Sequence, residues 1–430
     1  MKKNNSPKIL LISLRDPYLD SDRVMPPLGV MSLNSYLHSC GISSHIENDF
    51  DFSNPLKYSA YTHFGISCMT PQKKQAYEVL YAIKKQYPDR IVIIGGPHAD
   101  FYTQQCLDHP FDYIVVGDGE LALKEIILKQ PDNGRIINIS VTEKQMNEFP
   151  LPYRDPSFLT QYNFYVQGLK ATTILTAKGC PMSCAFCEHA GTKVRLYDPG
   201  IIDKQISQAK KSGYNCIMFF DDIFALSLKR VKDLTNIIRK HDITYRCFGH
   251  ARTMTEEMAK LLAETGCIEM GFGAESGSQL ILDKIDKKTT VEQNQRFVDL
   301  CNNFGIKVKA FMIVGLPGES YETVQETKKF LDFLTRKRFK NRFRDTVSND
   351  FDVTIYFPYK GTKIRDLIDA GSSKYDLLIL EDPDVFEGYY KGKSGSAEAL
   401  VRTSALSTEN IIKIQKDLLK SYKQKTIQFN

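Results

Sequence analysis

The sequence lacks any apolar stretch that approaches the roughly 20 consecutive residues needed to cross a membrane. Its N-terminus, MKKNNSPKILLISLRDP, holds only a short apolar run, which Arg15 and Asp16 end at once. A secretory signal peptide needs a longer apolar region and a small-residue cleavage site. We therefore expect a cytoplasmic protein without a membrane span.

Concentrated charge of one sign is also missing. The 57 basic and 51 acidic residues leave a formal net charge of +6, spread thinly along the chain. Residues 361–430 mix acidic residues with lysine and show no clear basic face. Nucleic-acid-binding domains concentrate their lysine and arginine, so no nucleic-acid partner is expected. A modest preference for anionic small molecules fits this charge better.

The chain has 430 residues, which is more than one ordinary core holds and indicates two or three domains. Residues 1–130 alternate short apolar runs, rich in β-branched residues, with helical patterns at 28–41 and 72–88. The expected strands are 8–14, 43–49, 63–69, 90–96 and 112–118. Strands alternating with helices predict a parallel, doubly wound α/β sheet, and five strands suit a flavodoxin-like order.

Residues 131–170 interrupt this alternation with Pro150, Pro152 and Pro156, and we interpret them as a linker. Strand and helix patterns resume over 171–360. The expected strands there are 171–179, 215–222, 244–251, 267–275, 307–315 and 350–357. Six β/α units are two short of a closed barrel, so an open, partial (β/α)6 barrel is predicted, with its active site at the C-terminal ends of the strands. Residues 361–430 are expected to form a small helical region.

Three of the ten cysteines stand together in the segment GCPMSCAFC, as Cys180, Cys184 and Cys187. The other seven are scattered singly through apolar stretches and are expected in the core. The segment follows the first barrel strand, so it should form a loop at the active-site end. Three thiolates cover three irons of a four-iron cluster and leave the fourth iron open. The alternative is a zinc site with His189 as a fourth ligand.

The spacing C-x3-C-x2-C, with an aromatic residue before the third cysteine, resembles the radical S-adenosylmethionine (SAM) superfamily over about residues 171–360. The resemblance implies a [4Fe–4S] cluster on Cys180, Cys184 and Cys187, with SAM chelating the open iron. An electron from the reduced cluster would cleave SAM, and the resulting 5′-deoxyadenosyl radical would take a hydrogen atom from a substrate. An electron donor such as flavodoxin or ferredoxin is implied as a partner.

Other positions match the superfamily's SAM-holding motifs. Asp221 and Asp222 end the second barrel strand, where the family faces the SAM amino group, although they could instead cap a helix. Arg252 follows the third strand and would pair with the SAM carboxylate, the alternative being a solvated arginine. Glu275 ends the fourth strand at the ribose position. Gly315, in MIVGLPGES, matches the adenine-flanking turn or an ordinary strand-to-helix turn.

The first domain resembles that of the cobalamin-binding radical SAM subfamily. The matching residues are the segment PPLG (26–29), Gly95 and Gly96 in IGGPH, and Gly117 in GDGE, all expected near strand ends where glycine lets a flat ring approach. Many cobalamin proteins carry Asp-x-His-x-x-Gly, whose histidine ligates cobalt, but this sequence has no such motif. His98 lacks the required neighbours, so cobalamin is expected without a lower histidine ligand. The alternative is a domain that kept the fold and lost the cofactor.

These resemblances imply a cobalamin-dependent radical SAM methyltransferase acting on an unactivated carbon of a small molecule. Two alternatives stay open. The same domains could catalyse a radical rearrangement, cyclisation or dehydration with a non-methylating or degenerate cobalamin domain. The chain could also be a non-enzymatic iron–sulfur or zinc module that senses redox state. No catalytic residue beyond the cofactor-binding set is assigned.

Overall fold

The computed structural model describes residues 7–15, 23–132, 134–386 and 397–423. The chain divides into two compact units, Met1–Asn163 and Phe164–Asn430. Among the described residues, no helix combines the length and the apolar character needed to cross a membrane.

The first unit is built on a sheet of six strands in the order β2-β1-β3-β4-β5-β6. Every pair in it is parallel. The strands are β1 (Lys8–Ser13), β2 (Ser43–Glu47), β3 (His63–Ser67), β4 (Ile91–Gly95), β5 (Tyr113–Val116) and β6 (Ile136–Asn138). Parallel strands are buried on both faces, which explains their continuous apolar runs such as IVIIG.

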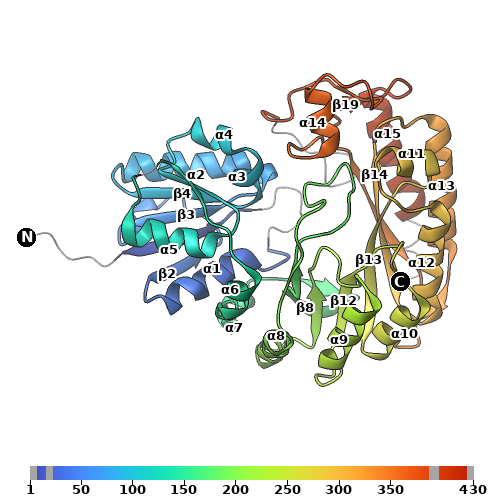
Figure 1. The fold of residues 1–430 in the computed structure, drawn as a ribbon, viewed down its shortest axis with the longest axis horizontal. Coiled ribbons are helices and arrows are strands. Elements are labelled where there is room, and N and C mark those ends of the chain that lie inside the picture. Colours follow the sequence, from blue (N-terminus) through green and yellow to red (C-terminus); the bar gives the residue numbers. More distant parts are fainter. Residues whose placement is uncertain (1–6, 16–22, 133, 387–396, 424–430) are drawn as a thin grey trace, which may run out of the picture. The chain divides into compact units, whose positions relative to one another are not determined.

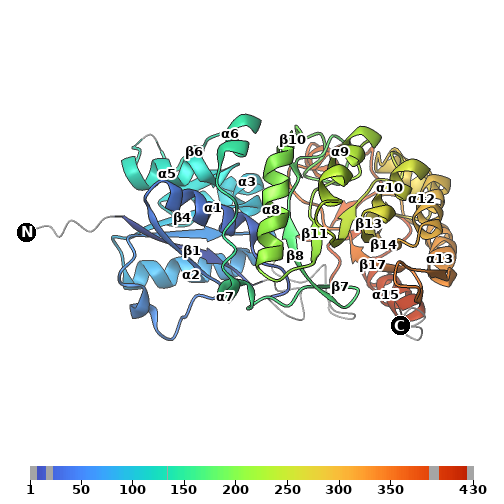
Figure 2. The same cartoon turned by 90° about the horizontal axis from the view of Figure 1, so that it is seen from below.

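Helices cover both faces of this sheet, as Figure 2 shows with α2 on one side and α1 and α5 on the other. Each face has its own apolar core, one around Ile83 of α2 and the other around Leu37 of α1 and Ile126 of α5. The helical elements are α1 (Leu28–Ser39), η1 (Pro55–Tyr58), η2 (Thr70–Gln72), α2 (Lys73–Gln86), α3 (Pro97–Phe101), α4 (Thr103–Leu107), α5 (Gly119–Lys129), α6 (Glu143–Glu148) and α7 (Pro156–Leu159).

The predicted doubly wound fold is confirmed, and its five expected strands are present in the flavodoxin-like order. The expected strand count was wrong by one, because β6 lies in the segment interpreted as a linker. This strand has only three residues, too few to show a periodic pattern. Its start is fixed by Arg135, whose guanidinium donates to the carbonyl oxygens of Phe111 and Leu107 at 2.8 Å each.

The second unit contains a seven-stranded sheet in the order β17-β14-β13-β12-β11-β8-β7. Six of the strands are parallel, and β7 pairs antiparallel with β8 at one edge. These seven strands are β7 (Tyr165–Val166), β8 (Leu169–Ile174), β11 (Cys216–Phe219), β12 (Thr244–Phe248), β13 (Cys267–Glu275), β14 (Lys307–Val314) and β17 (Asp350–Ile355). The six parallel strands confirm the predicted partial (β/α)6 barrel.

Helices line the outside of this curved sheet (Figure 1). They are α8 (Pro199–Lys211), α9 (Leu228–Ile238), α10 (Glu256–Glu264), α11 (Gln279–Lys284), α12 (Val291–Asn303), α13 (Tyr321–Arg336), α15 (Thr408–Leu418) and η3 (Leu419–Lys423). Helix α14 (Lys363–Asp369) stands apart from this layer, at the top of the view in Figure 1. Three two-stranded ribbons complete the unit: β9 (Ala177–Lys178) with β10 (Arg195–Leu196), β15 (Phe339–Lys340) with β16 (Thr346–Val347), and β18 (Leu378–Ile379) with β19 (Val401–Arg402).

Local sequence signals fix where the barrel helices begin and end. Ser227, Thr255 and Thr290 each accept a hydrogen bond from a backbone N–H in the first turn of their helix. Gly266 follows α10 with a φ of +106°, and a Cβ there would lie 2.1 Å from the carbonyl oxygen of Ile243. Only glycine fits this turn, which returns the chain directly into β13.

Candidate functional site

The cysteine-bearing loop lies after β8 and is closed at its base by the ribbon of β9 and β10. Gly179 enters the loop with a φ of +96°, and a Cβ there would lie 2.4 Å from the carbonyl oxygen of Lys193. The N–H of Cys180 donates to the Thr192 hydroxyl oxygen at 2.9 Å, and the N–H of Gly191 donates to the Met182 carbonyl oxygen at 2.6 Å. Hydrogen bonds within the loop therefore fix its backbone conformation without a bound ligand.

The three thiols of this loop lie close enough to influence one another electrostatically. Burial raises the pKa of Cys180 and Cys184, and it raises the pKa of Cys187 to about 12. The nearby charge of Lys287 opposes the rise at all three. In the described part of the chain, no three His, Cys, Asp or Glu side chains are grouped to hold one metal ion. An iron–sulfur cluster does not need three side chains to meet at one ion, because each thiolate binds a separate iron.

Asp221 is turned into the protein at the base of this loop. Its carboxylate accepts from the backbone N–H groups of Thr176 and Ala177, at 2.6 and 3.2 Å, and from the Thr176 hydroxyl. The side chain is 1% exposed, and burial raises its pKa to about 6. Arg230 donates to the Thr176 carbonyl oxygen at 2.6 Å and completes the contact. Asp221 thus fastens the start of the cysteine loop to the end of β11.

Asp222 joins the start of the cysteine loop to His189. Its carboxylate accepts from the Gly179 N–H at 3.2 Å and lies 2.9 Å from Nδ1 of His189. A carboxylate can only accept, so the His189 Nδ1 carries the proton in this contact. Neither aspartate is a helix N-cap, because Ser227 caps α9. Both carboxylates therefore hold the loop in position.

Glu275 ends β13 in a left-handed conformation with φ +61°. Its carboxylate oxygen Oε1 lies 2.7 Å from Nζ of Lys287, and each of the two side chains is 7% exposed. A Cβ at Gly273 would lie 2.0 Å from the same Oε1, so glycine at 273 makes room for the folded-back carboxylate. The ion pair lies at the C-terminal end of β13, where the sequence predicts a contact with SAM.

Lys287 contacts both Glu275 and the cysteine loop, and it was not predicted from the sequence. Burial by itself would lower its pKa, but the charges of Glu275 and Cys184 outweigh that effect and raise it. Its Nζ also lies 5.6 Å from the ring centroid of Phe186, the aromatic residue between the second and third cysteines. The Lys287 ammonium is therefore a buried positive charge that acts on all three thiols.

Two further groups stand at this end of β12. Arg252 is exposed and its guanidinium lies 3.9 Å from the sulfur of Met182, within the cysteine loop. His250, also missed from the sequence, is 6% exposed, and its Nδ1 accepts from the Arg252 N–H at 3.3 Å. Its Nε2 is buried with no hydrogen-bond partner in the structure. Burial, together with the charges of Lys287 and Arg252, lowers the pKa of His250 to about 3, so this ring is neutral.

Gly315 turns the chain after β14 with a φ of +83°. Its N–H donates to the carboxylate of Glu319, which is 1% exposed and also accepts from the Leu316 N–H. Burial raises the pKa of Glu319 to about 8. A Cβ at Gly315 would lie 3.2 Å from Ile411 of α15, so the turn packs against that helix. The GLPGE segment is accordingly a strand-to-helix turn that is held by the Glu319 carboxylate and by packing against α15.

A cavity of about 280 Å³ opens beside these residues inside the barrel. Phe186 of the cysteine loop and Glu275 of β13 line it, together with side chains of β14 and β17. The cavity thus adjoins the cysteine loop and the buried ion pair.

The candidate glycines of the first unit lie at the C-terminal edge of its sheet. Gly95 ends β4, and Gly96 follows with a φ of +94° and a Cβ position only 2.9 Å from the Cys68 carbonyl oxygen. Gly117, with a φ of +85°, donates its N–H to Asp100 at 2.7 Å, and the nearest atom to a Cβ there is 3.9 Å away. The edge is thus free of bulky side chains at Gly117, as a flat ring requires.

His98 does not share the open edge of the sheet. It is fully buried, and its Nε2 lies 2.9 Å from the hydroxyl of Tyr77. Its ring also stacks on Tyr102, with centroids 5.1 Å apart, and burial lowers its pKa to about 3. The residue is part of the apolar layer between the sheet and its helices.

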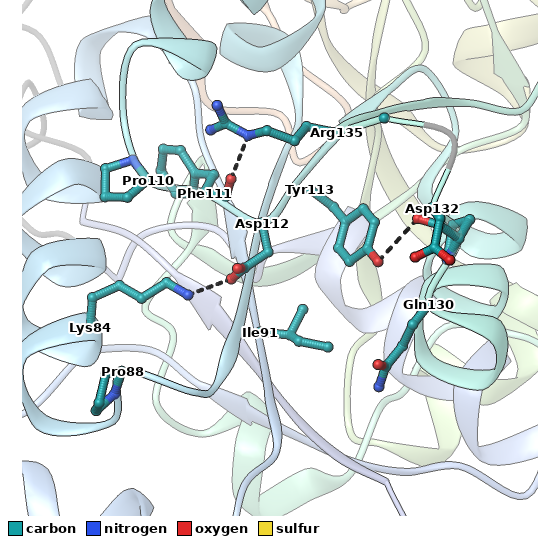
Figure 3. Close-up of a pocket in the computed structure, with 12 residues that line it drawn as sticks. Lys84, Pro88, Ile91, Pro110, Phe111, Asp112, Tyr113, Gln130, Asp132 and Arg135 are labelled. Carbon is teal, nitrogen blue, oxygen red and sulfur yellow. Dashed lines mark hydrogen bonds and ion pairs between the residues drawn. The ribbon is translucent and has the colours of Figure 1, made fainter.

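The larger cavity of about 800 Å³ lies in the first unit, at the start of β4 and β5 (Figure 3). Three of its charged side chains have partners within the protein: Lys84 contacts Asp112 at 2.6 Å, and Arg135 donates to the Phe111 carbonyl oxygen (Figure 3). Parallel α/β sheets bind ligands at the carboxyl ends of their strands, and this cavity is at the opposite ends. Size therefore does not identify the site, and the smaller cavity beside the cysteine loop is the functional candidate.

Comparison with protein families finds two matches. The model described as "Radical SAM superfamily" matches residues 174–331, and the model described as "B12 binding domain" matches residues 19–127. The first range spans the cysteine loop, β11 to β14 and Glu275. The second spans β2 to β5, whereas β1 and β6 lie outside it.

Several curated proteins are similar over most of the chain. An uncharacterized methyltransferase of Pyrococcus horikoshii is 28% identical over 79% of this chain and 77% of its own length. The bacteriochlorophyllide d C-8(2)-methyltransferase of Chlorobaculum tepidum is 25% identical, over 73% of this chain and 72% of its own. The anaerobic magnesium-protoporphyrin IX monomethyl ester cyclase of Rubrivivax gelatinosus is 26% identical over 71% of this chain, which spans 61% of that protein.

Solved structures share the fold. The radical SAM methyltransferase TsrM from Kitasatospora setae, with cobalamin and a [4Fe–4S] cluster bound, superposes with a TM-score of 0.67 at 17% identity, over 87% of this chain and 78% of that one. The cobalamin-dependent radical SAM enzyme OxsB, with aqua-cobalamin bound, gives a TM-score of 0.65 at 19% identity, over 86% and 56%. At identities this low, the superpositions establish a common fold and nothing further.

Proposed function

Because this chain belongs to the radical SAM superfamily and carries a B12-binding domain, we propose that it is a cobalamin-dependent methyltransferase acting on an unactivated carbon of a small molecule. Its cofactors are a [4Fe–4S] cluster, SAM and cobalamin. The observation that carries the proposal is the convergence of three thiols, the Glu275–Lys287 pair and a cavity at one end of the barrel. Among the relatives, methyltransferases support methyl transfer over the other radical reactions.

The cysteine loop fits a site-differentiated cluster. Cys180, Cys184 and Cys187 would hold three irons, and hydrogen bonds within the loop, together with those to Asp221 and Asp222, fix its shape. When bound, the cluster supplies the electron that cleaves SAM, and cobalamin supplies a metal that can carry a methyl group. Buried thiols with raised pKa must release their protons on ligation, and the charge of Lys287 lowers the cost of the thiolate form.

The side chains around the loop have separate tasks in this proposal. Asp221 and Asp222 keep the loop fixed, since their carboxylates are engaged with Thr176, Gly179 and His189. Glu275 is the hydroxyl acceptor for the SAM ribose, because a carboxylate held by Lys287 still has free lone pairs. Arg252 would pair with the SAM carboxylate as an exposed cation beside the loop.

In the first unit, Gly95, Gly96 and Gly117 would lie against the corrin ring at the carboxyl edge of the sheet. The backbone can approach a flat ligand there, because the nearest atom to the Cβ position of Gly117 is 3.9 Å away. His98 would stay in the core with Tyr77, so this chain would offer no imidazole from that position to the metal.

The reaction products test the proposal. Protein reconstituted anaerobically with iron, sulfide and hydroxocobalamin should be supplied with SAM and a reductant, and with extracts of metabolites from a deletion strain. We expect S-adenosylhomocysteine and 5′-deoxyadenosine together with a product heavier by one methyl group. Formation of 5′-deoxyadenosine without S-adenosylhomocysteine would instead indicate rearrangement, cyclisation or dehydration, and one of the relatives is a cyclase.

A paired substitution tests the SAM contact. Glu275→Gln removes the charge of the ribose acceptor while the cysteines are unchanged, so SAM should bind at least tenfold more weakly to a fully assembled cluster. Glu264→Gln, on the exposed side of α10, is the matched control and should leave SAM affinity unchanged. Equal SAM affinity in wild type and Glu275→Gln would remove Glu275 from the site.

A further inference from the structure

Helix α14 stands apart from the layer of helices that covers the barrel sheet (Figure 1). It follows β17 and lies beyond residue 331, where the match to the radical SAM family ends. Family resemblance therefore gives this helix no role, and neither does packing on the outside of the sheet. Its contacts with the cysteine loop indicate one.

The backbone of α14 contacts the middle of the cysteine loop. The N–H of Ile364, in the first turn of α14, donates to the carbonyl oxygen of Ala185 at 3.0 Å. Ala185 directly follows Cys184 in the sequence and is 1% exposed. Its own N–H donates to the carbonyl oxygen of Ile285 at 2.9 Å. Buried backbone groups rarely lack partners, and both polar groups of Ala185 find theirs in segments outside the loop.

The two segments that hold Ala185 are also joined to each other. Oδ2 of Asp286, in the turn 285–288, lies 2.6 Å from Nζ of Lys363 at the start of α14. Oδ1 of the same carboxylate lies 3.1 Å from Nζ of Lys288. Hydrogen bonds from Lys363 and then Lys288 lower the pKa of Asp286. The Asp286–Lys363 ion pair thus ties α14 to the turn 285–288, and Ala185 is bonded to both.

The start of α14 is itself anchored. Thr362 is the N-cap: its hydroxyl oxygen accepts from the Arg365 N–H at 3.4 Å, and its O–H donates to the Tyr359 carbonyl oxygen at 2.7 Å. The Arg365 side chain is 8% exposed, donates to the Pro358 carbonyl oxygen at 3.2 Å and pairs with Asp384 at 3.3 Å. The N–H that reaches the cysteine loop is therefore carried by a helix whose first turn is held on several sides.

The position of Ala185 affects two of the three thiols. The N–H of Cys187 donates to the carbonyl oxygen of Cys184 at 3.2 Å, so both cysteines and Ala185 belong to one tight turn. The properties of a four-iron cluster depend on hydrogen bonding around its sulfurs and on solvent exposure. Holding this turn at Ala185 fixes the arrangement of the two thiols as well as their exposure.

We infer that Ile364 is a positioning residue for the cluster, because its N–H holds the turn that presents Cys184 and Cys187. The Asp286–Lys363 ion pair keeps α14 beside the turn 285–288, as this contact requires. Residues 332–430 contain no cysteine. The region beyond the family match thus contributes to cluster binding through the backbone of α14.

Proline at position 364 removes the donor. The N–H groups in the first turn of a helix have no acceptor within the helix, so Ile364→Pro deletes the bond to Ala185 and is tolerated by α14. Ile364→Ala is the matched control, because it removes more of the buried side chain and keeps the N–H. Wild type and both full-length variants are reconstituted anaerobically with iron and sulfide, and circular dichroism checks that each is folded.

Two measurements then report on the loop without any substrate. Release of iron to excess bathophenanthroline disulfonate should be at least fivefold faster in Ile364→Pro and unchanged in Ile364→Ala. The electron paramagnetic resonance spectrum of the dithionite-reduced cluster should broaden in Ile364→Pro alone, because a loosened turn holds the thiolates in several arrangements. Lower folding stability by itself would not change the spectrum of an intact cluster. Neither measurement depends on whether the reaction is methyl transfer.

Wild-type iron release and a wild-type spectrum in Ile364→Pro would overturn the inference. Equal changes in Ile364→Ala would also overturn it, because side-chain packing would then be the cause.

If Ile364→Pro does not fold, Lys363→Met replaces it and should release iron at least twofold faster than wild type. Lys288→Met is its control, since Lys288 also contacts Asp286 and is similarly exposed, 57% against 52% for Lys363, but does not lie on α14. Equal rates of iron release in these two variants would refute the role of α14.

Discussion

Replacing Lys287 by Met should destabilise the second unit far more than the loss of an ordinary ion pair. The Lys287–Glu275 pair is 2.7 Å long, and each side chain is 7% exposed. Met preserves most of the side-chain volume and removes the charge, so Glu275 is left buried without its partner. Removing one member of a buried pair costs about 3–5 kcal/mol, because the remaining charge keeps its desolvation penalty and loses its compensation.

The same unit offers a matched control. Lys232 and Glu257 also approach to 2.7 Å, but their side chains are 50% and 54% exposed. An exposed pair contributes about 0–1 kcal/mol because water screens both charges. Lys232→Met should therefore have little effect, although it breaks a contact of equal length. The difference between the two variants isolates burial as the cause.

Urea denaturation of the cofactor-free protein, followed by circular dichroism, measures both effects in the unfolding transition of the second unit. The double variant Lys287→Met/Glu275→Gln should recover most of the loss, since it leaves no buried charge. A loss below 1 kcal/mol in Lys287→Met, equal to that in Lys232→Met, would refute the argument. So would a double variant no more stable than Lys287→Met alone.

Three further predictions concern other sites. Glu319→Gln should flatten the pH dependence of stability: the pKa of Glu319 is raised from 4.5 to about 8, so the native state binds the extra proton and loses up to about 1.4 kcal/mol per pH unit as pH rises between these values. Thermal unfolding of wild type and Glu319→Gln from pH 5 to 9 measures this, and a difference in stability between the two proteins that does not change with pH would contradict it. Cys184→Ala should abolish both the cluster absorbance and SAM cleavage, whereas Cys301→Ala, in the core, should leave both; native cleavage in Cys184→Ala would exclude the cluster assignment. His98→Ala should lower the free energy of unfolding by about 2 kcal/mol through lost packing, yet leave the absorption spectrum of bound cobalamin unchanged, and a shift in that spectrum would identify His98 as a cobalt ligand.

The succession of strands along the chain and the position of the cysteine loop could be predicted, because each depends on a local sequence pattern. A continuous β-branched run such as IVIIG predicts a buried parallel strand wherever it occurs. Three cysteines after the first barrel strand can only lie on a loop at the active-site end. The strand β6 carried no such pattern, because three residues are too few to distinguish a strand from a loop.

The partners of charged side chains could not be predicted, because they depend on contacts between distant segments. Asp221 and Asp222 are adjacent and identical in the sequence, yet one is 1% exposed and holds Thr176 while the other reaches Gly179 and His189. Both residues lie beyond the end of β11 at Phe219, so strand alternation does not determine their directions. Lys287 follows α11 in a lysine-rich turn that looks like a solvated surface.

The buried ion pair also explains why Glu275 adopts a left-handed backbone at the end of a strand. A non-glycine residue at φ +61° costs of order 1 kcal/mol or more, which the surroundings must offset. The contact with Lys287 supplies that compensation, and Gly273 leaves the space the carboxylate needs. An extended residue at 275 would point its side chain along the normal alternation of β13. The left-handed turn instead brings the carboxylate back beside Lys287 and Phe186, at the cysteine loop. The strain thus places a carboxylate beside the cysteine loop, as the role proposed for Glu275 at the SAM ribose requires.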